Sequence, residues 1–420
     1  MSDAGLVGEA AQRVSEAAEL LARADELATY SASATGIERT YLSPEHAQVN
    51  AVAGSWMREA GLRAWQDAAG NQCGRMEGDA PDLPALLLGS HLDTVPGAGR
   101  YDGVLGVLVA IAVAGRLTPG VLPFAVEVVA FGDEEGTRFG TTLLGSRALA
   151  GAWDDAWLDL VDARGTSLHE AAYTFGLDPA GMGDAGRDEG SLVGYLEAHI
   201  EQGPRLEDAG RALGVVTSIA AARRLLITLT GEARHCATPW HLRRDALLGA
   251  SEAVLAIERI AREQGSPATV GHLAVRPDAV NVIPGVAEFS LDLRDVTAQG
   301  RDATWALVRA ELDRIAAARG LTVAVAETHE APAVRCAPEL QDLLRAGIRA
   351  TGDPEPLELF SVAGHDAMAV AALTDVAMLF VRCAGGISHH ADESVTEADV
   401  AAAIDALHAA VLALAAEFAE

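Results

Sequence analysis

Positive charge is scarce in this sequence. Its 420 residues include 31 lysines and arginines against 60 aspartates and glutamates, which gives a formal net charge of −29. Proteins that bind nucleic acid need a basic footprint, and anionic lipid surfaces attract basic segments. We therefore expect neither a nucleic acid nor a membrane as partner, and we interpret the acidity as a well-solvated surface.

Cysteines and long apolar runs are also few. The four cysteines are scattered without a CxxC pair, which excludes a zinc ribbon and a disulfide framework and fits a reducing compartment. The longest apolar run, near residues 104–114, has about half of the ~20 residues that a membrane helix needs. The first residues have neither the basic start nor the apolar core of a secretion signal. These absences predict a cytoplasmic protein.

The chain length favours two domains, because single cores rarely grow beyond ~250–300 residues. Apolar strands alternate with helices in the first and last parts of the chain, which predicts an α/β core with a mostly parallel sheet. We expect strands at 62–76, 85–94, 124–132, 194–202 and 376–383, and helices up to about residue 29, at 103–115 and at 396–420.

The middle of the chain follows another order. Strand-like and helical segments succeed one another as β-α-β-β-α-β, the split pattern of a ferredoxin-like domain. The segments are 213–231, 245–265, 268–276, 286–296, 299–319 and 321–328. The prediction is a discontinuous catalytic domain at 1–213 and 330–420, interrupted by an inserted domain at 214–329.

Histidine and carboxylate residues gather at the ends of predicted strands. In GSHLDTVPGAGRYDG, strand alternation places His91 and Asp93 on one face, and Asp102 follows the turn-forming PGAG. A histidine that binds metal usually donates its other ring N–H to a carboxylate, and the side chain of Asp93 is well placed to accept it. Taken alone, His-x-Asp is equally compatible with a solvated strand end.

The segment FGDEEGTRFG carries three consecutive carboxylates after a buried strand. Asp133, Glu134 and Glu135 would repel one another unless positive charge lies among them. Adjacent side chains point to opposite sides, so one glutamate could bind a metal while the other serves as a base. A solvated acidic turn is the alternative.

Two further segments supply histidines. LEAHIEQGP contains His199 in an apolar strand, and GGISHHADE contains His389 and His390 after another strand. Each signal is weak alone, but together they provide nitrogen and oxygen ligands for two divalent ions. Histidine and carboxylate without thiolate suit Zn²⁺ or Mn²⁺. A two-metal site lowers the pKa of a shared water and polarises a carbonyl.

These motifs, in this order, resemble a known family. GSHLDTV, RYDGVLGV, DEEGTRF, LLGSRALAG, HIEQGP, NVIPG, DLR, AGHDA and GISH are similar to the dinuclear-metal amidohydrolases of the aminoacylase/carboxypeptidase superfamily. The similar branch is the hydantoinase/carbamoylase branch, which contains N-carbamoyl-L-amino-acid hydrolases and allantoate amidohydrolases. HIEQGP separates this branch from the plain peptidases, which tend to have a carboxylate at that ligand position.

The resemblance implies a ligand set and a base. His91 and His199 would bind one ion, Glu135 and His389 the other, and Asp102 would bridge them. Glu134 would be the general base, taking a proton from the bridging water and passing it to the leaving nitrogen. His390 is a bystander in this scheme. His365 and Asp366 of AGHDA would support the site from behind or start a helix.

The resemblance also implies substrate-binding residues on the inserted domain, which acts as a lid. They are His235 in GEARHC, Asn281 in NVIPG and Arg294 in DLR. A guanidinium suits bidentate capture of a carboxylate, and His235 would stabilise an oxyanion. Gln202 would contact the ureido end of the substrate. In this family the lid also pairs two protomers, so the resemblance implies a homodimer.

Several stretches are most similar to allantoate amidohydrolases, above all AGHDAMAVAALTDVAMLFVRCAGGISH. The implied reaction converts allantoate to ureidoglycine, ammonia and carbon dioxide in purine catabolism. Hydrolysis of an N-carbamoyl-L-amino acid is the alternative, because both reactions remove a ureido carbonyl beside a carboxylate. The chain departs from the family pattern at HCATPW, Ala222 and Val362, all of which bear on the substrate pocket rather than on the metals.

Other classes fit less well. A binding module would have lost a ligand or the base, and all of them are present. A thiol hydrolase would use Cys236 beside His235, but adjacent residues of a strand point apart and make a poor nucleophile–base pair. A serine hydrolase would need a GxSxG elbow, and a dehydrogenase would need GxGxxG after the first strand.

Overall fold

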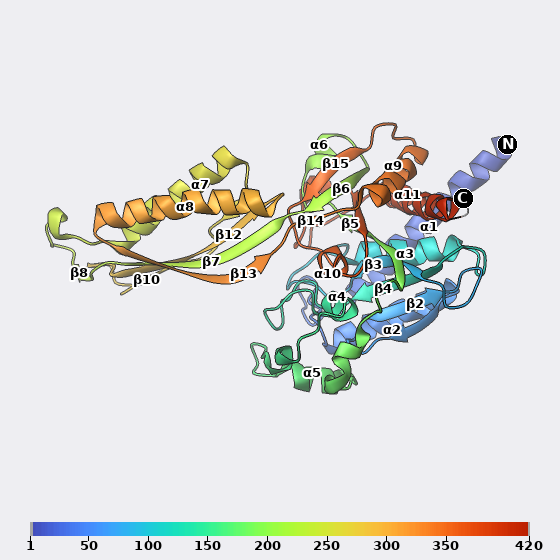
Figure 1. Cartoon of the computed structure of the whole chain (residues 1–420), viewed down its shortest axis with the longest axis horizontal. Coiled ribbons are helices and arrows are strands. Elements are labelled where there is room, and N and C mark those ends of the chain that lie inside the picture. The colour runs from blue at the N-terminus through green and yellow to red at the C-terminus, as the bar shows by residue number, and fades with distance from the viewer. Residues whose placement is uncertain (1–2, 419–420) are drawn as a thin grey trace. The chain divides into compact units, whose positions relative to one another are not determined.

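A computed structural model describes residues 3–418, with side chains from residue 16 onward (Figure 1). The chain divides into two compact units. The core unit contains the described residues up to Thr217, Cys336–Leu359 and those from His365 onward. The inserted unit contains Ser218–Arg335 and Phe360–Gly364.

A mixed sheet organises the core unit, in the strand order β1-β2-β4-β3-β5-β16-β6, with β15 beside β6. The four central strands, β4, β3, β5 and β16, run parallel, while β1, β2 and β6 join antiparallel at the flanks. The fold is therefore α/β with parallel strands at its centre, as the alternating pattern predicted. The bounds are β1 Arg63–Gln66, β2 Gln72–Met76, β3 Ala85–His91, β4 Ala125–Phe131, β5 Leu192–Ile200, β6 Leu213–Ile219, β15 Leu357–Ser361 and β16 Val376–Val381.

The central strands are apolar because both faces of the sheet are covered. Every residue of β3, β4 and β16 is buried, as expected of parallel strands between helices. Helix α3 packs on β3, β4 and β5, and α9 and α11 pack on β16. The helices of this unit are α1 Asp3–Ala28, α2 Pro44–Glu59, α3 Val104–Arg116, α4 Leu144–Leu149, α5 Leu168–Phe175, α6 Arg205–Asp208, α9 Pro338–Ala350, α10 Ala367–Val370 and α11 Glu397–Glu417, with 3-10 turns at Asp155–Asp159, Pro179–Ala185 and Ala384–Gly386.

The prediction of a single strand at 62–76 is wrong. The segment forms a hairpin of β1 and β2, in which Gln66 pairs with Gln72. The carboxylate of Asp67 accepts hydrogen bonds from the backbone N–H groups of Ala69 and Asn71 and so stabilises the turn. Aspartate, glycine and asparagine in DAAGN are the residues that such turns favour.

Helix α11 is long and apolar enough to cross a membrane by length and composition alone. Half of the apolar stretch of this helix is buried inside the core unit. The helix packs against α1, α3, α9 and β16, and residues such as Val400, Ile404 and Leu407 are fully buried there. These contacts make α11 a core helix of the unit.

In the inserted unit, two helices lie along one face of an antiparallel sheet, ordered β10-β12-β7-β13 (Figure 1). Buried and half-buried residues alternate along β12, and its buried residues, among them Phe289 and Leu291, join the core that α7 and α8 cover. The elements are β7 Ala221–Thr230, β8 Arg234–His235, the 3-10 turn Trp240–Leu242, α7 Ala246–Gln264, β9 Ala268–Thr269, β10 Leu273–Arg276, β11 Val282–Ile283, β12 Val286–Asp295, α8 Ala298–Arg319, β13 Thr322–Ala331 and β14 Val334–Arg335.

Candidate metal centre

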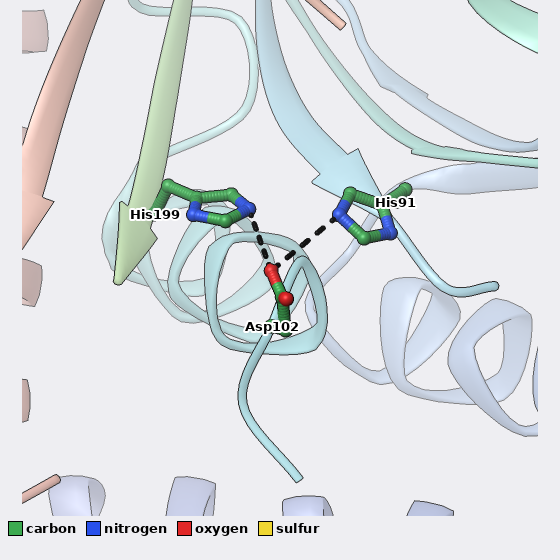
Figure 2. Close-up of side chains that lie close together, drawn as sticks. All are labelled: His91, Asp102 and His199. Carbon is green, nitrogen blue, oxygen red and sulfur yellow. Dashed lines mark ion pairs between the residues drawn. The ribbon is translucent and has the colours of Figure 1, made fainter. Parts of the chain in front are cut away.

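Two histidines meet at the carboxyl ends of neighbouring parallel strands. His91 is the last residue of β3, and His199 lies near the end of β5, its parallel neighbour. Their rings point into the same space, with centroids 5.7 Å apart, and both side chains are buried (Figure 2). Functional groups of parallel sheets commonly gather at this edge.

Asp102 lies between these two histidines, just before α3 (Figure 2). Its Oδ1 is 3.2 Å from Nε2 of His199 and 3.9 Å from Nε2 of His91. The next residue, Gly103, has a φ of +67°, and a Cβ there would lie 2.4 Å from the His91 ring. Glycine is therefore needed for the chain to pass so close to the histidine.

The outer ring nitrogens fix the orientation of both rings. Nδ1 of His91 donates to the backbone carbonyl of Asp93 at 3.0 Å, and Nδ1 of His199 donates to the carbonyl of Ile200 at 2.9 Å. In a neutral ring, Nε2 then carries no proton, and its lone pair faces the carboxylate of Asp102. Acceptor facing acceptor is repulsive unless a cation or a proton lies between them.

A second group of ligand types shares Asp102. Nε2 of His389 is 2.9 Å from Oδ2 of Asp102 and 3.2 Å from Oε1 of Glu135. His389 has a φ of +56°, a left-handed conformation that residues other than glycine seldom adopt. The two groups, His91–Asp102–His199 and Asp102–Glu135–His389, each bring their ligand atoms within 4.8 Å of one another.

Asp93 holds the backbone of the acidic turn that contains Glu134 and Glu135. Its carboxylate accepts the backbone N–H groups of Glu134 and Glu135, at 3.0 and 3.2 Å. The prediction that this carboxylate accepts the ring N–H of His91 is wrong: the backbone carbonyl of Asp93 accepts it, and Oδ1 stays 3.6 Å from Nδ1 of His91. Asp133 adopts a left-handed φ of +65°, which turns the chain sharply after β4.

Burial and neighbouring charges shift the pKa values of several residues at this site. Burial, and then repulsion from Glu135, raises the pKa of Glu134 well above its ordinary value. Burial opposes the charged form of His199, but the hydrogen bond and charge of Asp102 outweigh it and raise its pKa to about 9. Hydrogen bonds to Asp102 and Glu135 raise the pKa of His389 to about 10. Burial lowers the pKa of His91.

This set of donors fits divalent cations. The raised pKa values of His199 and His389 show that these positions favour positive charge between nitrogen and carboxylate, which bound cations would supply. Three imidazoles and two carboxylates without thiolate are the ligands of Zn²⁺ and similar metals. Burial of His91, Asp102 and His199 keeps competing water away from these ligand atoms.

Three polar residues surround Asp102 as well. Gln202 donates from Nε2 to Oδ2 of Asp102 at 3.0 Å, and the hydroxyl of Ser388 lies 2.9 Å from the same oxygen. Glu393 accepts the backbone N–H groups of Tyr101 and Asp102. The sequence singled out Gln202 but missed the parts of Ser388 and Glu393; their place beside His389 in ISHHADE was the available signal.

The AGHDA segment lies against the same site. The ring of His365 packs edge-on against the ring of His199, with centroids 4.5 Å apart. Asp366 occupies the position before the first residue of α10 and is fully buried.

The substrate-binding residues that the sequence predicted on the inserted domain lie in the inserted unit. His235 pairs with Val282 in the two-stranded β8–β11 sheet, and the carbonyl of Asn281 accepts the N–H of Cys236 at 2.9 Å, so His235 and Asn281 are neighbours. Nδ1 of the exposed His235 accepts the N–H of Ala237, which leaves the proton of the neutral ring on Nε2.

Arg294 lies on β12 of the same unit. Its guanidinium makes a two-point contact with Asp292, at 2.9 and 3.1 Å, and Nη1 donates to the carbonyl of Val362 at 2.7 Å. These contacts fix the plane of the guanidinium. The carbonyl of Val362, one of the departures from the family pattern, thus bears directly on a residue implied in substrate binding.

Cys236 is closer to His235 than strand alternation suggested. Its Sγ lies 4.0 Å from Nδ1 of His235, because β8 ends at His235 and the chain turns there. However, Nδ1 already accepts the N–H of Ala237 at 3.1 Å, which occupies the lone pair that a thiol proton would need.

Comparison with known proteins defines the class. A family model described as peptidase family M20/M25/M40 matches residues 87–413, and the chain belongs to this family. It is 39% identical to the allantoate deiminase of Arabidopsis thaliana, over 92% of this chain and 80% of that protein. It is 40% identical to an N-carbamoyl-L-amino acid amidohydrolase of Geobacillus stearothermophilus, over 90% of this chain and 94% of that protein.

A solved structure gives the same assignment. An amidase of the hydantoinase/carbamoylase family from Burkholderia multivorans matches with a TM-score of 0.86 and 32% identity, over 95% of this chain and 98% of that chain. The resemblance inferred from the motifs is thereby confirmed. The chain is an enzyme, an amidohydrolase of this family.

Proposed function

We propose that this enzyme is a two-metal hydrolase of a ureido or amide C–N bond beside a carboxylate. His91 and His199 would hold one ion, Glu135 and His389 the other, and Asp102 would bridge them. The observation that carries the proposal is the convergence of three imidazole Nε2 atoms on the two oxygens of Asp102. The donor set favours Zn²⁺ or Mn²⁺.

Divalent ions bound there would supply an acidified water and a polarised carbonyl. Glu134 is the base in this proposal: its carboxylate takes the proton of the attacking water and returns it to the leaving nitrogen. The backbone N–H of Glu134 donates to Asp93, which fixes the start of its side chain beside the ligand Glu135. Positive charge in the site would also lower the raised pKa of Glu134, so that it works as a base near neutral pH.

We assign the inserted unit as a lid with the ferredoxin-like topology. Its strand order β10-β12-β7-β13, with α7 and α8 between strands, supports that assignment. His235 would donate from Nε2 to the oxyanion, Asn281 would bind beside it, and Arg294 would capture the substrate carboxylate. Gln202 would contact the ureido group. The enzyme would form a homodimer through pairing of two lids, and it would act in the cytoplasm.

We propose allantoate as the substrate, hydrolysed to ureidoglycine, ammonia and carbon dioxide. The alternative is an N-carbamoyl-L-amino acid. The relatives quoted above bear both names at nearly equal identity, so identity does not favour one over the other. Similarity of the segment at 363–389 to allantoate amidohydrolases supports the first choice.

A substrate panel tests the proposal. The enzyme loaded with Mn²⁺ or Zn²⁺ is offered allantoate, several N-carbamoyl-L-amino acids, ureidopropionate and simple N-acyl amino acids. Release of ammonia scores the ureido substrates, and release of free amine scores the acyl ones. Turnover of allantoate above the others is expected; turnover confined to acyl amino acids would overturn the ureido proposal.

Glu134→Gln tests the base in the same assay. The amide keeps the size of the side chain but cannot take a proton, so turnover should fall by a factor of about 10²–10⁴. Metal analysis should still find two ions per chain, because Glu134 is not among the proposed ligands. Unchanged turnover with two ions bound would remove Glu134 as the base.

A further inference from the structure

Glu393 connects the two segments that bring Asp102 and His389 together. One oxygen, Oε1, accepts the backbone N–H of Tyr101 at 2.6 Å and that of Asp102 at 3.1 Å. The other oxygen, Oε2, is 3.1 Å from the hydroxyl of Ser388. That hydroxyl in turn lies 2.9 Å from Oδ2 of Asp102. Both carboxylate oxygens of Glu393 thus act on Asp102, one through its backbone and one through its side chain.

The chain is shaped to admit this carboxylate. Glu393 is 4% exposed although glutamate is rarely buried unless its oxygens are paired. A Cβ at Gly99 would lie 2.4 Å from Cβ of Glu393 and 2.5 Å from Oε1, so a larger residue could not stand there. The neighbouring Asp392, by contrast, is exposed, and its carboxylate lies 3.5 Å from Nδ1 of His390.

We propose that Glu393, together with Ser388, is a positioning residue for the bridging ligand Asp102. Two backbone N–H bonds set the position of the Asp102 main chain before α3, and Ser388 sets the rotation of its carboxylate. Both metal sites share Asp102, so an error in its position affects both at once. This inference rests on the proposed metal site and goes beyond it, because it assigns residues outside the proposed ligand set.

The hydroxyl of Ser388 has a single hydrogen for two neighbouring acceptors. Ser388 faces two carboxylates, Asp102 and Glu393, but it can donate to only one of them at a time. Nε2 of Gln202 also donates to Oδ2 of Asp102, so that oxygen keeps a donor when the hydroxyl turns toward Glu393. Asp102 and Glu393 therefore share the hydroxyl, and Glu393 holds the serine oxygen in place beside Oδ2 of Asp102.

Metal binding without substrate tests this role. Ion-stripped enzyme is titrated with Co²⁺, whose visible absorption reports the geometry of its ligands. Glu393→Ala should raise the Co²⁺ concentration for half-saturation by about 10- to 100-fold, the usual effect of losing a residue that orients a metal ligand, and should change the band shape. Glu393→Gln should recover most of the affinity, because its amide oxygen still accepts both backbone N–H groups.

Two further variants complete the design. Asp392→Ala, next in the chain but exposed, should bind Co²⁺ like the wild type. Ser388→Ala removes only a hydroxyl, so it tests the same contact if Glu393→Ala does not fold, and its half-saturation should rise severalfold. The rise in melting temperature on adding Co²⁺ separates positioning from general stability: it should shrink in Glu393→Ala and Ser388→Ala but not in Asp392→Ala.

The outcomes distinguish the two proposals. Wild-type protein that binds no Co²⁺ overturns the metal site itself and this inference with it. Wild-type protein that binds two ions, with Glu393→Ala and Ser388→Ala equal to it in affinity and spectrum, overturns the positioning role alone.

Discussion

At the scale of single residues, the guanidinium of Arg294 is held in one orientation, as the proposed capture of a carboxylate would require. Asp292 and the carbonyl of Val362 hold its guanidinium in one plane. A fixed fork loses less entropy on binding a carboxylate than a free one. Arg224 contacts the same Asp292 from β7 at 3.0 Å and offers a matched comparison.

Arg294→Lys should therefore weaken substrate binding. A lysine keeps the charge but cannot make the two-point contact, so KM for a carboxylate substrate should rise by about 10-fold or more, with a smaller fall in kcat. Steady-state kinetics measure both constants. Arg224→Lys should leave KM nearly unchanged; equal effects of the two variants would argue against carboxylate capture by Arg294.

Substitutions at His235 and Cys236 distinguish the metal-dependent route from a route with a thiol nucleophile. His235→Ala should lower kcat by about 10²-fold with little change in KM, because an oxyanion donor acts chiefly in the transition state. Cys236→Ser should leave kcat nearly intact, since Nδ1 of His235 already accepts the N–H of Ala237. Activity assays on both variants decide the matter: abolition by Cys236→Ser would favour a thiol nucleophile.

At the scale of elements, the first turn of α2 carries a buried histidine. Burial, aided by Arg39 and Arg138, lowers the pKa of His46 to about 3. Its Nδ1 accepts the N–H of Leu42, and its ring stacks on Phe175 with centroids 5.3 Å apart. The neutral ring is therefore part of the packing between α2 and α5.

This histidine should make folding sensitive to acid. The unfolded chain binds a proton at His46 below about pH 6.5, and the folded chain does not until about pH 3, so the stabilisation is complete above 6.5 and is lost as pH falls toward 3. The free energy of unfolding should fall by up to ~1.4 kcal/mol per pH unit from this group.

Urea unfolding at pH 7.5, 6 and 5 measures that slope. His46→Gln, although less stable at pH 7.5, should lose less stability on acidification than the wild type. The comparison between the two proteins cancels the contribution of other titrating groups. Identical slopes would show that His46 is not the group responsible.

Elements were predictable from sequence where periodicity was strong, and less so where a turn was short. The apolar runs of β3, β4 and β16 identified buried parallel strands, because only sheets covered on both faces need such runs. The β1–β2 hairpin was missed, although the turn-forming residues of DAAGN between its two short strands were a local signal for it. The motifs named ligand types, but the contact of Glu393 with Tyr101 joins residues 292 positions apart, which no local pattern reveals.

At the scale of the whole molecule, the net charge of −29 sets the field that a substrate crosses. Asp102, Glu134 and Glu135 are the acidic residues assigned direct roles at the metals, and two divalent ions would more than balance them. The remaining acidic surplus lies elsewhere and repels an anionic substrate at long range. On the proposed function, attraction would be local and would come from the two ions and Arg294.

Added salt should therefore raise kcat/KM for an anionic substrate. Ions screen repulsion between exposed charges beyond about 10 Å at 0.1 M, but they screen short contacts inside the site much less. Between about 10 and 150 mM NaCl, kcat/KM for an N-carbamoyl-L-amino acid or allantoate should rise by a few fold.

The matched control is the carboxamide of the same N-carbamoyl amino acid, which is neutral and should show no salt dependence. Any general effect of salt on folding or metal binding would change both substrates alike, so the ratio of their kcat/KM values isolates the charge effect. A ratio that falls with salt would mean that the local positive charge of the ions and Arg294 reaches farther than the acidic surface, and would reverse the sign of the steering argued here.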